Sequence, residues 1–405
     1  MPFFLPCLFR KKFFRWLVKF LLILFGIEFF GLEEKSCAQE PFLATGKKNP
    51  PQVFTAPKAR LRKENKKINL ISRVAILKGS DIYSLTREAI NSIGGIRRIV
   101  HRGDKVFIKP NYVTGGLDGH DPVASGEIPH PAAVAAVAEE CVRAGAKEVI
   151  IGEWAERPVV INFAGREGKE GAQIKDRIGL LNKKYGNKIY LVNLMNCTSY
   201  FTYVPSSTNL RYLAIPNIVA EADVIISIPS LKTHHKPSPV SLGMKNFMGI
   251  MPSTLYGEPR RKLHEAGVHQ VIVDINKALR PSLVVVSAAF GMENRGASTF
   301  LDGVPVDVSK RIGGYLVLAG YDPVAVDATA TRLISKSWRP VPEDPLLGVP
   351  WYIHHIRMAY EQGLGNIRQD RIKIEGVALN EVAMDWKPSD DGVYPEKPGD
   401  KYQPW

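Results

Sequence analysis

Short apolar runs alternate with amphipathic stretches through the middle of the chain, from about residue 72 to residue 336. Apolar runs of strand length cover 73–77, 104–109, 147–151, 188–192, 211–215, 223–228, 282–287 and 315–318. Stretches with the apolar spacing of a helix cover 81–92, 130–144, 172–185, 268–279 and 323–335. Strands that alternate with helices across short turns predict an α/β fold, with a doubly wound, mostly parallel sheet and helices on both faces.

The two ends of the chain have a different composition from this 72–336 domain. The tail, 337–405, is rich in Pro, Trp and Asp and holds one further helical stretch at 350–361. We interpret it as a C-terminal extension that packs on the core of the domain. Residues 39–71 are rich in Lys, Pro and Asn, which is typical of a flexible linker.

The first 38 residues have the pattern of an export signal. Basic residues between Arg10 and Lys19 precede a short apolar stretch at 20–27, and Ser36-Cys37-Ala38 offers the small residues that a signal peptidase reads. We therefore predict a signal peptide at 1–38 and an exported, periplasmic protein. The alternative is a protein anchored to the membrane by an uncleaved signal. A degenerate twin-arginine motif leaves the export route open.

Charge and cysteine content narrow the classes of partner. The chain has 405 residues, and its 54 Lys and Arg against 40 Asp and Glu give a net charge of +14. This excess favours an anionic ligand. Because no basic run is interleaved with aromatic residues, we expect no nucleic-acid partner. The four cysteines show no C-x-x-C spacing, so no iron–sulfur cluster or structural zinc is expected on this chain. A bridge between Cys141 and Cys197 stays open.

The densest set of polar residues follows the apolar run at 223–228. Lys232, His234, Lys245 and Asn246 all lie within the next eighteen positions. In open α/β sheets, ligands bind just past the carboxyl ends of the strands. We therefore expect these side chains to face one cleft, where the lysines hold an anion and His234 transfers a proton or binds a metal. The alternative is a basic loop with no defined role.

Two other strand ends carry polar residues that could complete this cleft. Lys109 and Asn111 follow the run at 104–109, where they could bind a carboxylate or a phosphate. Glu153 follows the run at 147–151 and could serve as an acid or a base, as a counterpart of His234. The structural alternatives are a surface turn capped by Asn111 and a solvated Glu153 carboxylate.

A further group of polar residues lies later in the chain. His264 and His269 flank a predicted helix and join His234 as candidate metal ligands, although no compact ligand motif is present. Asp322 and Asp327 stand at the start of the helix predicted at 323–335 and could bind ligand at the edge of the cleft. A structural role is the alternative that is favoured for both, and for Asp322 this role is that of an N-cap.

These motifs together resemble one known family. The segments that carry the likeness are FIKPN, IIGE, IISIPSLKTHH, GMKNFMGIM and LAGYDPVAVDATA. In this order they resemble the family called domain of unknown function 362, over residues 72–335. The family's recurring polar positions correspond to Lys109, Asn111, Lys232, His234, Lys245, Asn246, Asp322 and Asp327.

The resemblance implies the fold but no settled activity. Many members carry ferredoxin-like iron–sulfur modules or cysteine clusters, and this sequence departs from them in having none. A looser likeness to the nickel-pincer lactate racemase superfamily implies lysines and histidines around a nucleotide-derived cofactor, without that superfamily's signature motifs. The cofactor of this chain, if any, is left open.

The leading hypothesis is an exported protein with a basic, His-containing cleft for an anionic small molecule. As an enzyme it would transfer a proton next to a carboxylate or hydrolyse an anionic ester, with His234, Lys232 and Glu153 as the catalytic candidates. The alternatives are a non-catalytic periplasmic binding protein and an accessory to a redox or metal system whose clusters lie on a partner chain.

Overall fold

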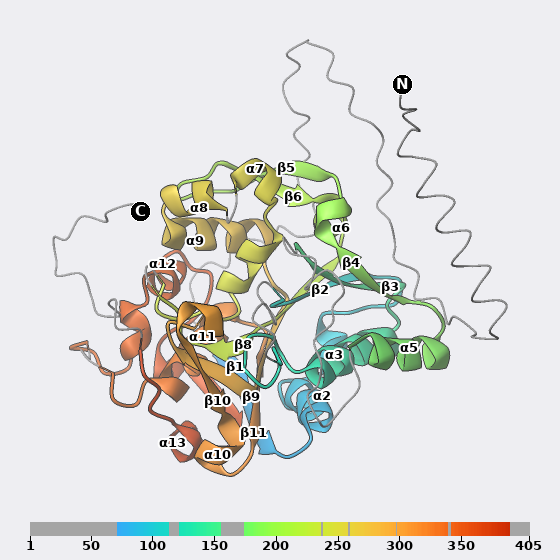
Figure 1. Ribbon diagram of the computed structural model, residues 1–405. Helices are drawn as coiled ribbons and strands as arrows, with labels where there is room; N and C mark the ends of the chain where they lie inside the picture. The colour runs from blue at the N-terminus through green and yellow to red at the C-terminus, as the bar shows by residue number, and fades with distance from the viewer. Residues whose placement is uncertain are drawn as a thin grey trace, which may run out of the picture. The chain divides into compact units, whose positions relative to one another are not determined.

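The computed structural model describes residues 71–112, 121–154, 174–235, 238–257, 260–296, 298–338 and 342–388. One ten-stranded sheet organises them (Figure 1). Eight strands follow the spatial order β12-β1-β11-β9-β7-β2-β3-β4, while β8 and β10 both pair with β9. The bounds are β1 Ser72–Gly79, β2 Lys105–Pro110, β3 Glu148–Glu153, β4 Ile189–Asn193, β7 Val224–Ile228, β8 Ser230–Lys232, β9 Leu283–Asn294, β10 Gly303–Asp307, β11 Tyr315–Gly320 and β12 Ile372–Gly376.

Most neighbouring strands of this sheet run parallel. The pairs β4–β3, β3–β2, β2–β7 and β7–β9 are parallel, as are β9–β8 and β1–β12. β11 runs antiparallel to both of its neighbours, β9 and β1, and β10 runs antiparallel to β9. The antiparallel pairs arise because β9, β10 and β11 follow one another through short connections rather than through crossover helices. The predicted mostly parallel α/β fold is confirmed.

Helices cover both faces of the sheet, and the strand residues alternate between two apolar layers. Along β2, Phe107 packs in one layer while Val106 and Ile108 pack in the other. The layer of Val106 contains α2 (Ile82–Ser92), α3 (Pro131–Ala144) and α5 (Ile174–Tyr185). The layer of Phe107 contains the 3-10 helix η5 (Lys245–Ile250), α9 (Val268–Leu279), α11 (Pro323–Ile334) and α12 (His354–Glu361). A strand buried on both faces explains the near-continuous apolar runs in the sequence.

A second, two-stranded sheet lies beside the main one. The run predicted at 211–215 forms β6 (Tyr212–Pro216), which pairs antiparallel with β5 (Ser199–Tyr203) and not with the main sheet. Four short α-helices connect the longer elements: α6 Asn217–Ala220, α7 Ser253–Tyr256, α8 Arg261–Glu265 and α10 Val308–Ile312.

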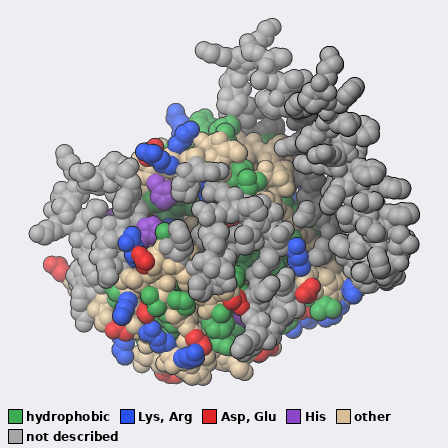
Figure 2. Space-filling view, in the orientation of Figure 1, with side chains coloured by type: hydrophobic (Ala, Val, Ile, Leu, Met, Phe, Trp, Pro, Cys, Tyr) green, Lys and Arg blue, Asp and Glu red, His purple; other side chains and the backbone are tan. Residues whose placement is uncertain are grey.

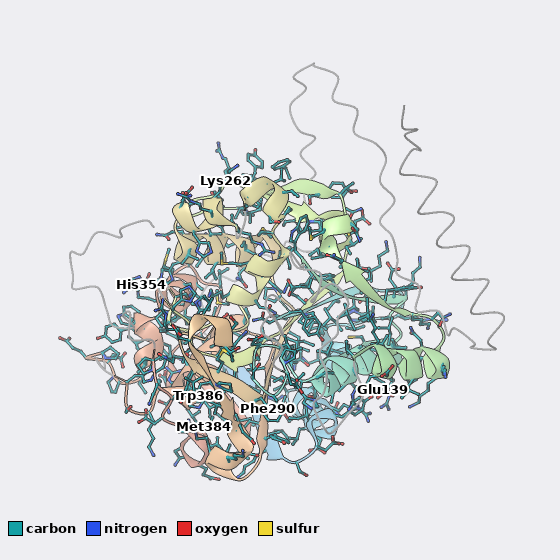
Figure 3. All side chains as sticks on the ribbon, in the orientation of Figure 1. Glu139, Lys262, Phe290, His354, Met384 and Trp386 are labelled. Carbon is teal, nitrogen blue, oxygen red and sulfur yellow. The ribbon has the colours of Figure 1, made fainter. Side chains whose placement is uncertain are left out.

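The C-terminal segment up to residue 388 is part of the core. β12 extends the sheet as the neighbour of β1, and the short helix α13 (Leu379–Val382) follows it. Backbone N–H groups of Met384 and Trp386 then donate to the carbonyls of Leu333 and Ile334 at the end of α11, and Figure 3 labels both residues. Trp338 and Trp386 are each 1% exposed. The main sheet therefore depends on the tail for part of its apolar covering.

The predicted signal peptide at 1–38 and almost all of the predicted linker at 39–71 lie outside the described residues. Both stay predictions. Within the part of the chain that the structure describes, no helix has the length and hydropathy needed to cross a membrane. Cys141 and Cys197 are not joined by a disulfide, so the bridge that the sequence left open is not formed.

Candidate functional site

The carboxyl ends of β2, β3 and β7 bring the first group of polar residues together. Lys109 stands opposite Ser227 in the β2–β7 register, and Glu153 is the last residue of β3 on the other side of β2. The three strands are parallel neighbours, so their ends meet at one edge of the sheet, as the strand-end pattern predicts. Lys109, Glu153 and Ser227 are all fully buried.

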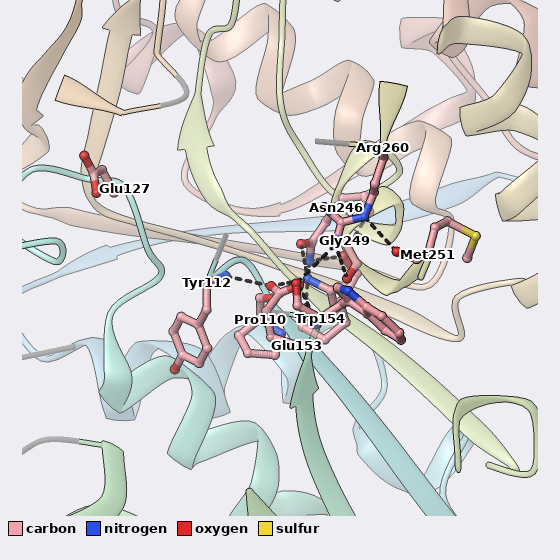
Figure 4. A network of polar contacts seen from close by, with 12 residues as sticks. Pro110, Tyr112, Glu127, Glu153, Trp154, Asn246, Gly249, Met251 and Arg260 are labelled. Carbon is pink, nitrogen blue, oxygen red and sulfur yellow. Dashed lines mark hydrogen bonds and ion pairs between the residues drawn. The ribbon is translucent and has the colours of Figure 1, made fainter. Parts of the chain in front are cut away.

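Lys109 and Glu153 form a buried ion pair (Figure 4). The Lys109 Nζ lies 2.5 Å from Glu153 Oε2 and also donates to the carbonyl of Pro110 at 2.8 Å. The Glu153 carboxylate accepts two more hydrogen bonds, from the backbone N–H groups of Tyr112 and Trp154. Burial lowers the pKa of Lys109, although the charge of Glu153 opposes that shift. Glu153 was predicted as a counterpart of His234, but its described bonds neutralise Lys109 and hold the loops after β2 and β3.

Asn246 and Gly249 of η5 close over this pair. The Asn246 side chain accepts a hydrogen bond from Lys109 Nζ at 3.1 Å and donates to the Lys109 carbonyl and to Ser227 Oγ. A Cβ at Gly249 would lie 2.6 Å from Glu153 Oε1 and 2.8 Å from Lys109 Nζ, so only glycine fits there. Asn246, predicted to bind ligand, therefore fixes η5 onto the ends of β2 and β7.

Arg260 supports the same region and was not predicted from the sequence. Its guanidinium is buried and donates to the carbonyls of Met251, Trp154 and Gly249, so it ties the C-terminal end of η5 to the end of β3 (Figure 4). The backbone of Arg260 has a positive φ of 63°, a conformation that a non-glycine residue adopts at a cost. An arginine before a short helix has no sequence pattern that would indicate this role.

Asp322 and Asp327 also bond to the protein itself. Asp322 caps α11 by accepting from the N–H groups of Val324 and Ala325, and its other oxygen accepts from Ser72 Oγ and Asn366 N. Asp327, one turn later, accepts from the N–H groups of Gly243 and Met244 just before η5. Their described bonds match the structural alternative for both residues, and Asp327 anchors the segment that carries Lys245.

The anchor made by Asp327 is expected to weaken as pH rises. Burial raises the pKa of Asp327 to about 7 from 3.8, so the folded chain keeps this proton at pH values where the unfolded chain has lost it. The free energy of unfolding, relative to that of Asp327→Asn, should fall by at most about 1.4 kcal/mol per pH unit between pH 4 and pH 7. Urea unfolding of both proteins across this range measures the difference. A difference that is constant or grows with pH would contradict the raised pKa.

Lys232 and Lys245 form the basic part of the site. Lys232 ends β8 and donates from Nζ to the carbonyl of Glu127 at 2.7 Å. Burial lowers its pKa to about 8, although the nearby Glu127 carboxylate opposes that shift. Burial, together with the charge of Lys232, holds the pKa of Lys245 well below its usual range. The Lys245 side chain makes no hydrogen bond and no ion pair with any described residue.

His234 lies beside these two lysines. Its ring stacks on that of His235, and its Nδ1 lies 2.9 Å from the His235 carbonyl oxygen. A carbonyl only accepts hydrogen bonds, so Nδ1 carries the hydrogen and Nε2 keeps its lone pair. Burial, then the charge of Lys245, holds the pKa of His234 well below its ordinary value. His234 is therefore a neutral imidazole with Nε2 available as a proton acceptor.

The other two metal candidates do not gather around His234. His264 on α8 lies close enough to Lys245 for that charge to help lower its pKa to about 4, after burial. His269 on α9 packs instead against His354 and His355 of α12. Among the described residues, no three His, Cys, Asp or Glu side chains are placed to hold a metal ion. Figure 2 shows histidines beside Lys and Arg side chains in the part of the view where Figure 1 has α8 and α12.

The structure thus divides the predicted site residues into two sets. Lys109, Glu153 and Asn246 form a neutralised network in the core, whereas Lys232, His234 and Lys245 form a basic cluster next to it. Asn111 is buried at the end of β2, where its backbone N–H donates to the Ile228 carbonyl. Lys236 lies outside the described residues. His355, which faces the cluster from α12, was missed because the tail was treated only as a covering segment.

Comparisons with known proteins relate this chain to one family and to two individual proteins. Residues 106–332, over half of the chain, match the sequence model of a family described as "Domain of unknown function (DUF362)". The chain is 25% identical over 281 residues to "Thylakoid-associated protein sll1697" of Synechocystis sp. (strain ATCC 27184 / PCC 6803 / Kazusa), covering 68% of this chain and 77% of that protein. It is also similar to the lactate racemase apoprotein from Thermoanaerobacterium thermosaccharolyticum. That likeness has a TM-score of 0.31 and 12% identity and covers 58% of this chain and 52% of the other.

Proposed function

The chain belongs to the DUF362 family, a domain of unknown function, and we propose that it binds an anionic small molecule at the basic cluster of Lys232, His234 and Lys245. The observation that carries the proposal is the imbalance of buried charge. Lys109 has Glu153, and Lys232 has the nearby carboxylate of Glu127, but Lys245 has no carboxylate partner among the described residues. A bound anion would add a negative charge beside the Lys232 ammonium, and their attraction is strong in a region of low dielectric.

The three residues would have different roles, because their pKa values favour different protonation states. Lys232, with a pKa of about 8, is mostly charged at neutral pH and would hold the anion. His234 is a neutral imidazole that can accept a proton, and burial lowers the pKa of Lys245 well below its usual range, which favours its uncharged form. Such bases beside a cation suit proton transfer at a carbon next to a carboxylate, because the cation stabilises the negative charge that develops.

Binding of a simple carboxylate tests the proposal. Lys232→Met removes the charge and keeps the aliphatic stem, so we expect the affinity for propionate to fall by about ten- to a hundredfold, the worth of one charge-assisted hydrogen bond. Isothermal titration of the purified full chain measures it. Lys310→Met is the matched control, because the Lys310 side chain is 83% exposed, and it should bind as the wild type does.

The wild-type protein gives an independent readout should Lys232→Met fail to fold. Lys232 loses its charge above a pKa of about 8, so propionate affinity should weaken as pH rises from 7 to 9. Equal affinity in wild type and a folded Lys232→Met, or affinity that does not change over this pH range, would overturn the assignment of the anion to this cluster.

A further inference from the structure

Lys245 differs from the other buried lysines in its surroundings and its exposure. Lys109 bonds to Glu153, Pro110 and Asn246, and Lys232 bonds to Glu127. Lys245 makes no such bond to the described residues, yet it is 9% exposed, against 0% and 2% for the other two. Its neighbours His234 and His235 are partly exposed. Of the three lysines, Lys245 therefore has the fewest hydrogen bonds to described residues and the largest exposed fraction.

Among the described residues, the titratable groups that interact electrostatically with Lys245 are all basic. They come from three elements and a loop: Lys232 from β8, His234 from the loop after it, His264 from α8 and His355 from α12. The carboxylates of Glu153 and Asp327 are held by Lys109 and by backbone N–H groups. Burial and the charge of Lys232 both disfavour the ammonium form of Lys245, so its uncharged form is favoured relative to that of an exposed lysine.

We propose that Lys245 is a nucleophile that forms an imine with a 2-oxo carboxylate whose carboxylate group is held by Lys232. An uncharged lysine beside a second cation is an established way to activate an amine toward carbonyl carbon. The acid group follows from Lys232, which with a pKa of about 8 is mostly charged at neutral pH. This inference rests on the proposed function and names the class of ligand.

The step balances without any other reactant. The Lys245 nitrogen lone pair attacks the carbonyl carbon, a C–N bond forms, and the C=O electron pair moves to oxygen. His234 Nε2 takes a proton from nitrogen and returns it to the oxygen. The C–O bond then breaks, and water leaves with both hydrogens of the amine. Once the neutral imine takes up a proton from solvent on its nitrogen, it would withdraw electrons from the neighbouring carbon, which makes a proton there easier to remove and fits the proton transfer proposed above.

Reductive trapping tests the imine on the full chain. Pyruvate with sodium cyanoborohydride, which supplies the hydride, should leave one reduced adduct per chain, and peptide mapping should place it on Lys245. Lys245→Arg should abolish the adduct, whereas Lys310→Arg, an exposed control, should not. No adduct on folded wild type, or adducts spread over exposed lysines, would overturn the proposal.

Two further measurements keep the test decisive. Should Lys245→Arg fail to fold, the wild-type pH profile replaces it. Labelling of Lys245 should rise less steeply from pH 6 to 9 than labelling of an ordinary lysine, which rises about tenfold per unit below its pKa. Propionate, which lacks the carbonyl, separates the two proposals. If propionate and pyruvate bind but no adduct forms, the imine is wrong and the anion site stands. If neither binds and no adduct forms, both are wrong.

Discussion

Glu153→Gln is expected to lower the free energy of unfolding by about 3–5 kcal/mol, the cost of removing one partner from a buried ion pair. The amide keeps the shape of the side chain but removes its charge. The Lys109 ammonium then remains fully buried with only neutral partners, Pro110 and Asn246. An amide also accepts poorly through its NH₂ end, so one of the N–H groups of Tyr112 and Trp154 loses its acceptor. Urea unfolding at neutral pH measures the loss.

Two further variants show that the pair itself is the cause. Lys109→Met combined with Glu153→Gln removes both charges and should recover part of the loss, because no unpaired ion is left. Glu265→Gln removes one partner of an exposed pair, Arg261–Glu265 on α8, with side chains 75% and 45% exposed. That change should stay within about 0.5 kcal/mol. If Glu153→Gln costs no more than Glu265→Gln, the ion pair does not hold the strand ends together.

The fold was predictable where burial alone determines the pattern. The helix expected at 268–279 is α9, Val268–Leu279, because its apolar spacing records the one face that it buries. β9 runs on from the expected 282–287 to Asn294, and its last residues pair with β8 and β10. Gly291, Glu293 and Asn294 have the composition of a turn, so only the pairing of distant segments makes them a strand.

The position of the strand-end residues was also predictable, but their roles were not. Parallel strands of similar length end at one edge, so Lys109 and Glu153 had to lie near each other. Whether two opposite charges face a ligand or each other depends on side-chain directions and on a distant glycine, Gly249, that leaves room for the pair. The sequence contains both charges but not their distance. The hydrogen bonds from Arg260 to three carbonyls could not be predicted from the sequence either, because backbone acceptors have no sequence signature.

The difference between the two lysine environments changes how the basic cluster is interpreted. Lys109 lies on β2, an interior strand, and is neutralised within the fold. Lys245 lies at the first residue of η5, whose position is set by Asp327 before it and by Asn246 and Arg260 after it. The ion-pair network therefore supports the cluster indirectly, because it fixes the position of η5, the short helix that carries Lys245. Loss of the network should disturb ligand binding and stability together.

Trp386→Ala is expected to cost about 3–5 kcal/mol of unfolding free energy, the range for deleting a large buried aromatic side chain. Trp386 is 1% exposed and packs so closely on β9 that a Cβ at Gly291 would lie 2.3 Å from its ring. Its carbonyl also accepts from Trp338 Nε1 at 2.8 Å, which joins two tryptophans of the tail. Thermal and urea unfolding measure the change. Trp386→Phe should lose less, and Leu180→Ala, at a leucine that is 64% exposed, should stay within about 0.5 kcal/mol. A loss for Trp386→Ala as small as that of Leu180→Ala would mean that the domain of residues 72–336 holds its core without the tail.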